Sequence, residues 1–129
     1  MKLTGAFLAE AAATVDQKLN VQGGVLSKYT VGPDRFARFV LVVLTRPDDD
    51  GGGDRRVDVE IRPPTPDAPV HKWFEAPEAA VGEFPGFAFF EIDARLPSDG
   101  RWAVDVSCAG TAISLPLVVS SWKPSTFGI

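Results

Sequence analysis

The feature that most constrains the fold is an apolar run in the first half of the chain. Residues 36–44 read Phe-Ala-Arg-Phe-Val-Leu-Val-Val-Leu, with unbroken apolar side chains from Phe39 to Leu44. The run is too short to cross a membrane as a helix, and its β-branched and aromatic residues favour a strand. Since successive side chains of a strand point to opposite faces, both faces here are apolar. The run therefore predicts a strand that is covered on both faces or lies inside a sheet.

Two other segments alternate strictly between apolar and polar residues. Residues 57–62 and 102–108 each place one apolar set on one face and one polar set on the other, as half-buried antiparallel strands do. Cys108 falls in the apolar phase and is expected to fill the core. Ala109 and Gly110 then form a turn, and residues 111–115 begin a return strand.

Shorter strands are predicted over residues 3–9, 18–21, 25–31, 70–74 and 87–94, with Gly, Pro and Asp clusters between many of them. In the last of these, Phe87 and Phe89 face one way while Ala88 and Phe90 face the other. The Ala-rich residues 11–17 could form a single helical turn. Together the segments predict an all-β chain, a two-layer antiparallel β-sandwich of about seven to eight strands, immunoglobulin-like or jelly-roll-like. A barrel is the alternative architecture.

Length and charge limit the organisation and the partners of the chain. Its 129 residues suit one compact domain, and we assign residues 1–121 to it and residues 122–129 to a C-terminal aromatic tail. The 17 acidic residues outnumber the 13 basic ones, and the longest basic run is Arg55-Arg56. Nucleic acids and anionic membranes both select for clustered cations, so neither is expected as a partner.

The single cysteine and the N-terminal sequence bear on the compartment. One cysteine cannot form an intramolecular disulfide, which fits a reducing environment. The apolar stretch at residues 3–9 is short for a signal peptide and is interrupted by Glu10. We therefore expect a cytoplasmic protein.

Catalytic and metal-binding patterns are weak. His71 is the single histidine, and no nucleophile motif accompanies it. Asp48, Asp49, Asp50 and Asp54 could offer oxygen ligands, but their spacing differs from that of a calcium-binding loop and is typical of a solvated hairpin loop. We expect no catalytic residue, no metal, no cofactor and no enzymatic activity.

Aromatic side chains in loops and at strand ends are the candidate binding residues. The set comprises Trp73, Phe74, Phe84, Phe87, Trp122 and Phe127. The structural alternative is that these rings close the open ends of the sandwich. The functional alternative is that they anchor another protein or line a ligand groove.

One resemblance is carried by motifs within the first 24 residues. Lys2-Leu3-Thr4 with Phe7-Leu8-Ala9, followed by residues 18–24, Lys-Leu-Asn-Val-Gln-Gly-Gly, resembles the start of a family of small, uncharacterised bacterial proteins, a domain of unknown function. The resemblance implies a single β-rich domain and carries over no catalytic residue.

The leading hypothesis for function is a non-catalytic protein interaction module or accessory subunit, with a protein partner or a second copy bound through exposed aromatics, the tail or a strand edge. The alternative is a protein that binds a small sugar or lipid-like ligand on Trp73, Phe74, Phe84 and Phe87. A hydrolase or metal-dependent enzyme built on His71 ranks third.

Overall fold

The structure is a computed structural model that describes residues 1–48 and 53–123. Within these residues the chain is all-β, with ten strands and one short 3-10 turn, and no helix is long and apolar enough to cross a membrane. In chain order the elements are β1 (Lys2–Ala9), β2 (Ala11–Val15), β3 (Lys18–Gln22), β4 (Lys28–Val31), β5 (Phe36–Arg46), β6 (Arg56–Arg62), β7 (Val70–Glu75), η1 (Glu78–Ala80), β8 (Gly86–Arg95), β9 (Gly100–Cys108) and β10 (Thr111–Ser121).

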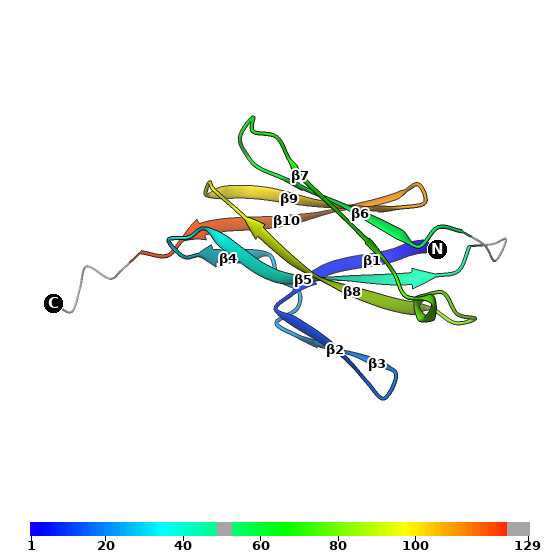
Figure 1. Cartoon of the computed structure of the whole chain (residues 1–129). Helices are drawn as coiled ribbons and strands as arrows, with labels where there is room; N and C mark the ends of the chain where they lie inside the picture. Colours follow the sequence, from blue (N-terminus) through cyan, green and yellow to red (C-terminus); the bar gives the residue numbers. More distant parts are fainter. Residues whose placement is uncertain (49–52, 124–129) are drawn as a thin grey trace.

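The strands form three sheets that pack against one another (Figure 1). One sheet has the order β1-β5-β8, the second has the order β4-β10-β9-β6-β7, and β2 and β3 pair only with each other. The long apolar strand β5 occupies the middle of the three-stranded sheet, as its sequence predicts. Strand β1 also contacts β9 and β10, so the two larger sheets approach each other along this side and curl around one core.

The core lies between the two larger sheets. Strand β5 contributes Phe39, Leu41 and Val43, and the alternating strands β6 and β9 contribute the apolar sets predicted from their sequences. Cys108 is buried in this core. Each large apolar side chain removed from water here stabilises the fold by roughly 1.5–3 kcal/mol, so the core is the main source of stability.

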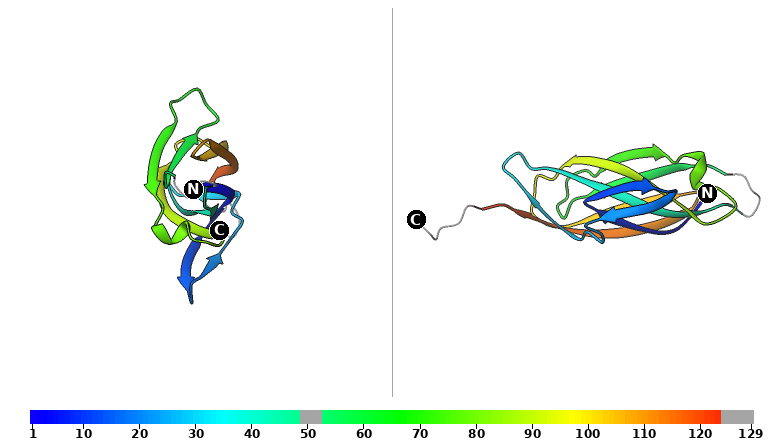
Figure 2. Two further views of the ribbon diagram at one scale, coloured as in Figure 1. Left: turned by 90° about the vertical axis from the view of Figure 1, so that its right-hand side faces the viewer. Right: turned by 90° about the horizontal axis from the view of Figure 1, so that it is seen from below.

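Three details differ from the sequence-based prediction. The described residues form ten strands rather than seven or eight, and the sheets curl instead of forming two plain layers (Figure 2). Residues Ala11–Val15 form a strand, because the turn at Asp16 and Gln17 lets them pair with β3 before a helix could gain a second turn. The pairing is not wholly antiparallel, since β4 runs parallel to the end of β10.

The β2–β3 hairpin projects from the body of the molecule (Figures 1 and 2). Most of its side chains are exposed, including Val15 next to the turn. At its base, the amide of Glu10 donates to the carbonyl of Gln22, and β2 contacts β5. The hairpin therefore lies beside the outer face of the three-stranded sheet.

A hydrogen-bonded cluster around Arg35, the Arg35 clamp, ties together one end of the molecule. Its guanidinium donates to the carbonyl of Leu96 (2.9 Å), to the Asp99 carboxylate (2.9 Å) and to the Ser121 hydroxyl (2.5 Å). The Ser121 hydroxyl in turn donates to Asp99 at 2.6 Å. The clamp thus joins the β4–β5 turn, the β8–β9 turn and the end of β10.

The clamp should make stability depend on pH. The hydrogen bond from Ser121, and then the one from Arg35, lower the pKa of Asp99 below its ordinary value. Because the folded-state pKa lies below the unfolded value of about 3.9, the stabilisation is complete above that value and is lost as the pH falls through the folded pKa. Asp99→Asn should therefore be less stable than wild type at neutral pH, and the difference should shrink below about pH 4.

The measurement is urea unfolding of wild type and Asp99→Asn between neutral and acidic pH. Ser121→Ala should show the same trend to a smaller extent, since it removes the first of the two hydrogen bonds. A stability difference that stays constant down to the acid limit would contradict this account of the clamp.

Candidate binding groove beside strand β8

Part of the outer face of the β1-β5-β8 sheet is apolar, although it points away from the core. Phe7, Val42 and Phe89 are cross-strand partners and form one row across the three strands. The next row holds Gly5, Leu44 and Phe87. Val42 is 0% exposed while Leu44 is 37% exposed, so the cover over this face is incomplete.

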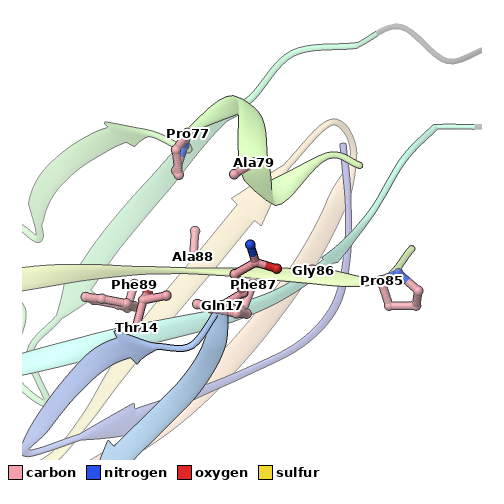
Figure 3. Close-up of a pocket in the computed structure, with 9 residues that line it drawn as sticks. All are labelled: Thr14, Gln17, Pro77, Ala79, Pro85, Gly86, Phe87, Ala88 and Phe89. Atoms are coloured by element: carbon pink, nitrogen blue, oxygen red, sulfur yellow. The ribbon is translucent and has the colours of Figure 1, made fainter. Parts of the chain in front are cut away.

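A groove opens along the first half of β8, and we call it the β8 groove (Figure 3). Its volume is about 560 Å³. Thr14 and Gln17 at the end of the β2–β3 hairpin form one wall, Pro77 and Ala79 form the other, and residues 85–89 form the floor. Strand β8 is an edge of its sheet among the described strands, so the groove runs beside a strand edge.

Two phenylalanines dominate the floor. The rings of Phe87 and Phe89 are nearly parallel, at 8°, with centroids 6.5 Å apart. Both side chains are half-buried, and both point to the hairpin side of the strand (Figure 3). The polar side chains in the lining are Thr14 and Gln17, and neither is titratable, so the groove is an apolar surface with a few hydrogen-bonding groups.

The wall at η1 is held by a buried hydrogen bond and a close backbone approach. The hydroxyl of Thr45, which is fully buried, donates to the carbonyl of Ala80 at 2.5 Å. A Cβ on Gly86 would lie 2.8 Å from the same carbonyl oxygen. Only glycine lets β8 pass this close to η1, so Gly86 and Thr45 together set the width of the groove.

The hairpin wall is placed by the segment that follows it. The amide of Leu26 donates to the carbonyl of Leu8 at 2.7 Å, which returns the chain to β1 after the hairpin. Gly24 lies beside the ring of Phe7, where a Cβ would come within 3.3 Å of the ring and 2.9 Å of Val21. This close packing fixes the base of the hairpin over the outer face of the sheet.

The structure separates the predicted binding residues Trp73 and Phe74. They are neighbours on β7 and point to opposite faces. Trp73 is 58% exposed on the outer face of its sheet, with the Arg56 guanidinium 4.7 Å from the ring centroid. Phe74 points inward and stacks on Phe90, with centroids 4.8 Å apart. Phe74 therefore packs against the core, and Trp73 is not among the residues that line the β8 groove.

The other predicted residues are also dispersed. Phe87 lines the groove, and Phe84, 73% exposed, precedes the groove residue Pro85. Trp122 is 61% exposed at the other end of the molecule, where its amide donates to the carbonyl of Val31. Phe127 lies outside the described residues. Of the predicted residues in the described part of the chain, only Phe87 lines the groove, and Phe84 directly precedes its floor in the sequence.

Sequence reasoning did not select Phe89, Thr14 or Gln17 as binding residues. The sequence does contain a signal for Phe89. It alternates with the inward-facing residues Ala88 and Phe90, so β8 is apolar on both faces at this point, like its neighbour β5. Two adjacent strands of this kind leave an apolar outer face that needs cover. Nothing in the sequence signals that Thr14 and Gln17 lie opposite this strand.

The remaining candidates are spread over different parts of the described chain. Burial raises the pKa of the Cys108 thiol, whose sulfur lies 3.5 Å from the carbonyl of Met1. The Met1 ammonium forms an ion pair with Asp48, while residues 49–52 lie outside the described part of the chain. His71 is exposed on β7. Residues 1–48 and 53–123 contain no group of three His, Cys, Asp or Glu side chains able to hold a metal ion.

Comparison of the chain with protein-family models, with curated proteins and with solved structures finds no match. The resemblance to a family of small bacterial proteins stays a prediction.

The contact at Gly86 yields a test of how the groove is built. Gly86→Ala should lower the free energy of unfolding by about 1–3 kcal/mol, because the new methyl group collides with the backbone at Ala80. The matched control is Gly82→Ala in the neighbouring loop, where no atom lies within 4 Å of the added Cβ. Gly82→Ala should leave the stability unchanged or raise it by up to about 1 kcal/mol.

Equilibrium urea unfolding of both variants provides the measurement. Equal stability of Gly86→Ala and Gly82→Ala would show that η1 is not held against β8 as described.

Proposed function

We propose that this chain is a non-catalytic protein interaction module or accessory subunit, and that it docks a protein partner in the β8 groove. The observation that carries the proposal is the apolar outer face of the β1-β5-β8 sheet, which the β2–β3 hairpin only partly covers. Protein partners are bound at such places, where aromatic side chains lie beside an unpaired strand edge.

The surroundings of the groove support a protein partner. Phe84 is a large apolar side chain, 73% exposed, in the residue that directly precedes the groove floor at Pro85. An exposed apolar area next to a pocket is typical of an interface with an aromatic anchor. The lining holds no titratable side chain, which favours docking over acid–base chemistry.

The proposal includes the setting inferred from the sequence. The scaffold is interpreted as a sandwich of the immunoglobulin-like or jelly-roll-like kind, in a small protein of the bacterial family that the N-terminal sequence resembles. A cytoplasmic location is proposed because the single cysteine is free and buried.

The second candidate is a small apolar ligand, and the volume of the groove favours it. About 560 Å³ lies within the range of pockets that bind small molecules, and Phe87 with Phe89 would stack on a flat or lipid-like group. In this candidate function the ligand binds in the β8 groove. It does not bind on a surface formed by Trp73, Phe74, Phe84 and Phe87, as the sequence predicts.

Site-specific photo-crosslinking in the native cell tests the proposal. A photoreactive phenylalanine at position 84 should give a discrete protein adduct, whereas the same group at position 73, which is also exposed but lies on the other sheet, should give none. Ala79→Arg should fill the groove and reduce the yield at position 84 by about tenfold or more, as a loss of about 1.4 kcal/mol of binding would.

The outcomes separate the two candidates. Equal adducts at positions 73 and 84, or adducts that persist in Ala79→Arg, would contradict docking in the groove. No protein adduct, together with a small apolar compound that raises the Tm of wild type but not of Ala79→Arg, would establish the ligand-binding function instead.

A further inference from the structure

We propose that the occupant of the β8 groove is the C-terminal tail of a second copy of this chain, so that copies join head to tail. The tail segment is Pro124-Ser125-Thr126-Phe127-Gly128-Ile129. This inference rests on the proposed function, because it names the partner that the groove accepts.

The spacing of apolar side chains in the tail matches that of the groove. Phe127 and Ile129 are two residues apart, so an extended segment would place both on the same face. Phe87 and Phe89 show the same spacing on the floor of the groove. Two apolar side chains of an added strand can therefore lie over two rings of β8.

The edge of β8 offers the backbone half of the interaction. On an edge strand, every second residue directs its N–H and C=O groups away from its neighbour, where an extended peptide can pair with them. The three-stranded sheet ends at β8 among the described strands, and the groove runs along this edge between the hairpin and η1. A tail bound here would extend the sheet by one strand.

The length of the tail excludes docking within the same copy. Ser121 and Arg95 both lie at the Arg35 clamp end, whereas Gly86 pairs with Thr45 at the opposite end. Phe87 is eight residues along β8 from Arg95, which corresponds to about 26 Å. Beyond the end of β10 the described chain continues away from the sheets (Figure 1), so Lys123 is no closer to Phe87 than the clamp end is. Residues 124–129 reach at most about 21 Å from Lys123 even when fully extended, so Phe127 and Ile129 cannot lie over Phe87 and Phe89 of the same copy.

Charge at the two sites is complementary. Glu78 and Glu83 are exposed on the segment that forms the η1 wall and continues to the groove floor. Lys123 directly precedes the tail segment, and no residue from Trp122 to Ile129 has an acidic side chain. A tail entering the groove would bring this cation towards these carboxylates, which favours association at low ionic strength.

The geometry makes the interface heterologous, since a tail on one copy meets a groove on the next. Such an interface leaves one free groove and one free tail after each step, so copies add in open chains or close into a ring. The observed mass should therefore rise with concentration beyond that of two chains.

A complementation experiment with the full chain tests this geometry. Ala79→Arg blocks the groove and keeps the tail, while the double variant Phe127→Ser/Ile129→Ser keeps the groove and disables the tail. By sedimentation velocity, each variant alone should have the mass of one chain, and an equimolar mixture should form a dimer that grows no further. Wild type should exceed two chain masses at up to about 1 mM, where even a weak interface with a Kd near 1 mM is populated.

Folding is checked separately by circular dichroism and thermal melting. Ala79 is exposed, and Thr14→Arg on the opposite wall serves as a second groove variant if Ala79→Arg unfolds. Both groove variants should complement the tail variant.

Three results would overturn the inference: a tail variant that still associates, a mixture that stays at one chain mass while wild type associates, or wild type that stays at one chain mass throughout. In the last case, a crosslinked adduct to a different protein at position 84 would leave the proposed function intact. Absence of both self-association and any groove-dependent adduct would reject the two proposals together.

Discussion

Strand β5 is apolar on both faces, and burial of those two faces is the constraint on which the rest of the structure depends. Its inner side chains, Phe39, Leu41 and Val43, are covered by the five-stranded sheet. Its outer side chains need separate cover, which comes from Phe7, from the phenylalanines of β8 and from the β2–β3 hairpin beside them. The hairpin is too narrow to cover the whole face, and the β8 groove is the part that it leaves open.

The two ends of the molecule are built differently, and this difference gives the groove its access. At the Arg35 clamp end, Arg35, Asp99 and Ser121 close the sheets together with charge-assisted hydrogen bonds. At the other end, Thr45 and Gly86 hold η1 close to β8 through one buried hydrogen bond and one close approach. The clamp holds the strands together at one end, and the other end leaves an apolar strand edge open. This arrangement would let a partner dock without a change in the core.

The sequence predicts the core better than the site. Strict alternation places Val57, Val59 and Cys108 in the interior correctly, because a half-buried strand has one dry and one wet face. It also predicts that β8 directs Phe87 and Phe89 away from Phe90. Alternation does not show which segment lies opposite a given face of a strand. It therefore does not predict the hairpin wall at Thr14 and Gln17.

Long-range pairing explains the remaining differences. The parallel pairing of β4 with β10 joins segments that are about ninety residues apart, and no local pattern encodes such a pair. The Ala-rich residues 11–15 favour a helix by intrinsic propensity, yet pairing with β3 determines their conformation. The aromatic residues chosen as one surface from their closeness in sequence were dispersed because Trp73 and Phe74 point to opposite faces of β7.

The central proposal is that this chain binds another protein through the β8 groove. Amide hydrogen–deuterium exchange of the native assembly, compared with the dissociated chain, tests that claim directly. We expect slower exchange in the assembly at residues 85–89 and 14–17, with unchanged exchange on strands β6 and β9 inside the five-stranded sheet. Slower exchange confined to β6 and β9, with no change beside β8, would contradict it.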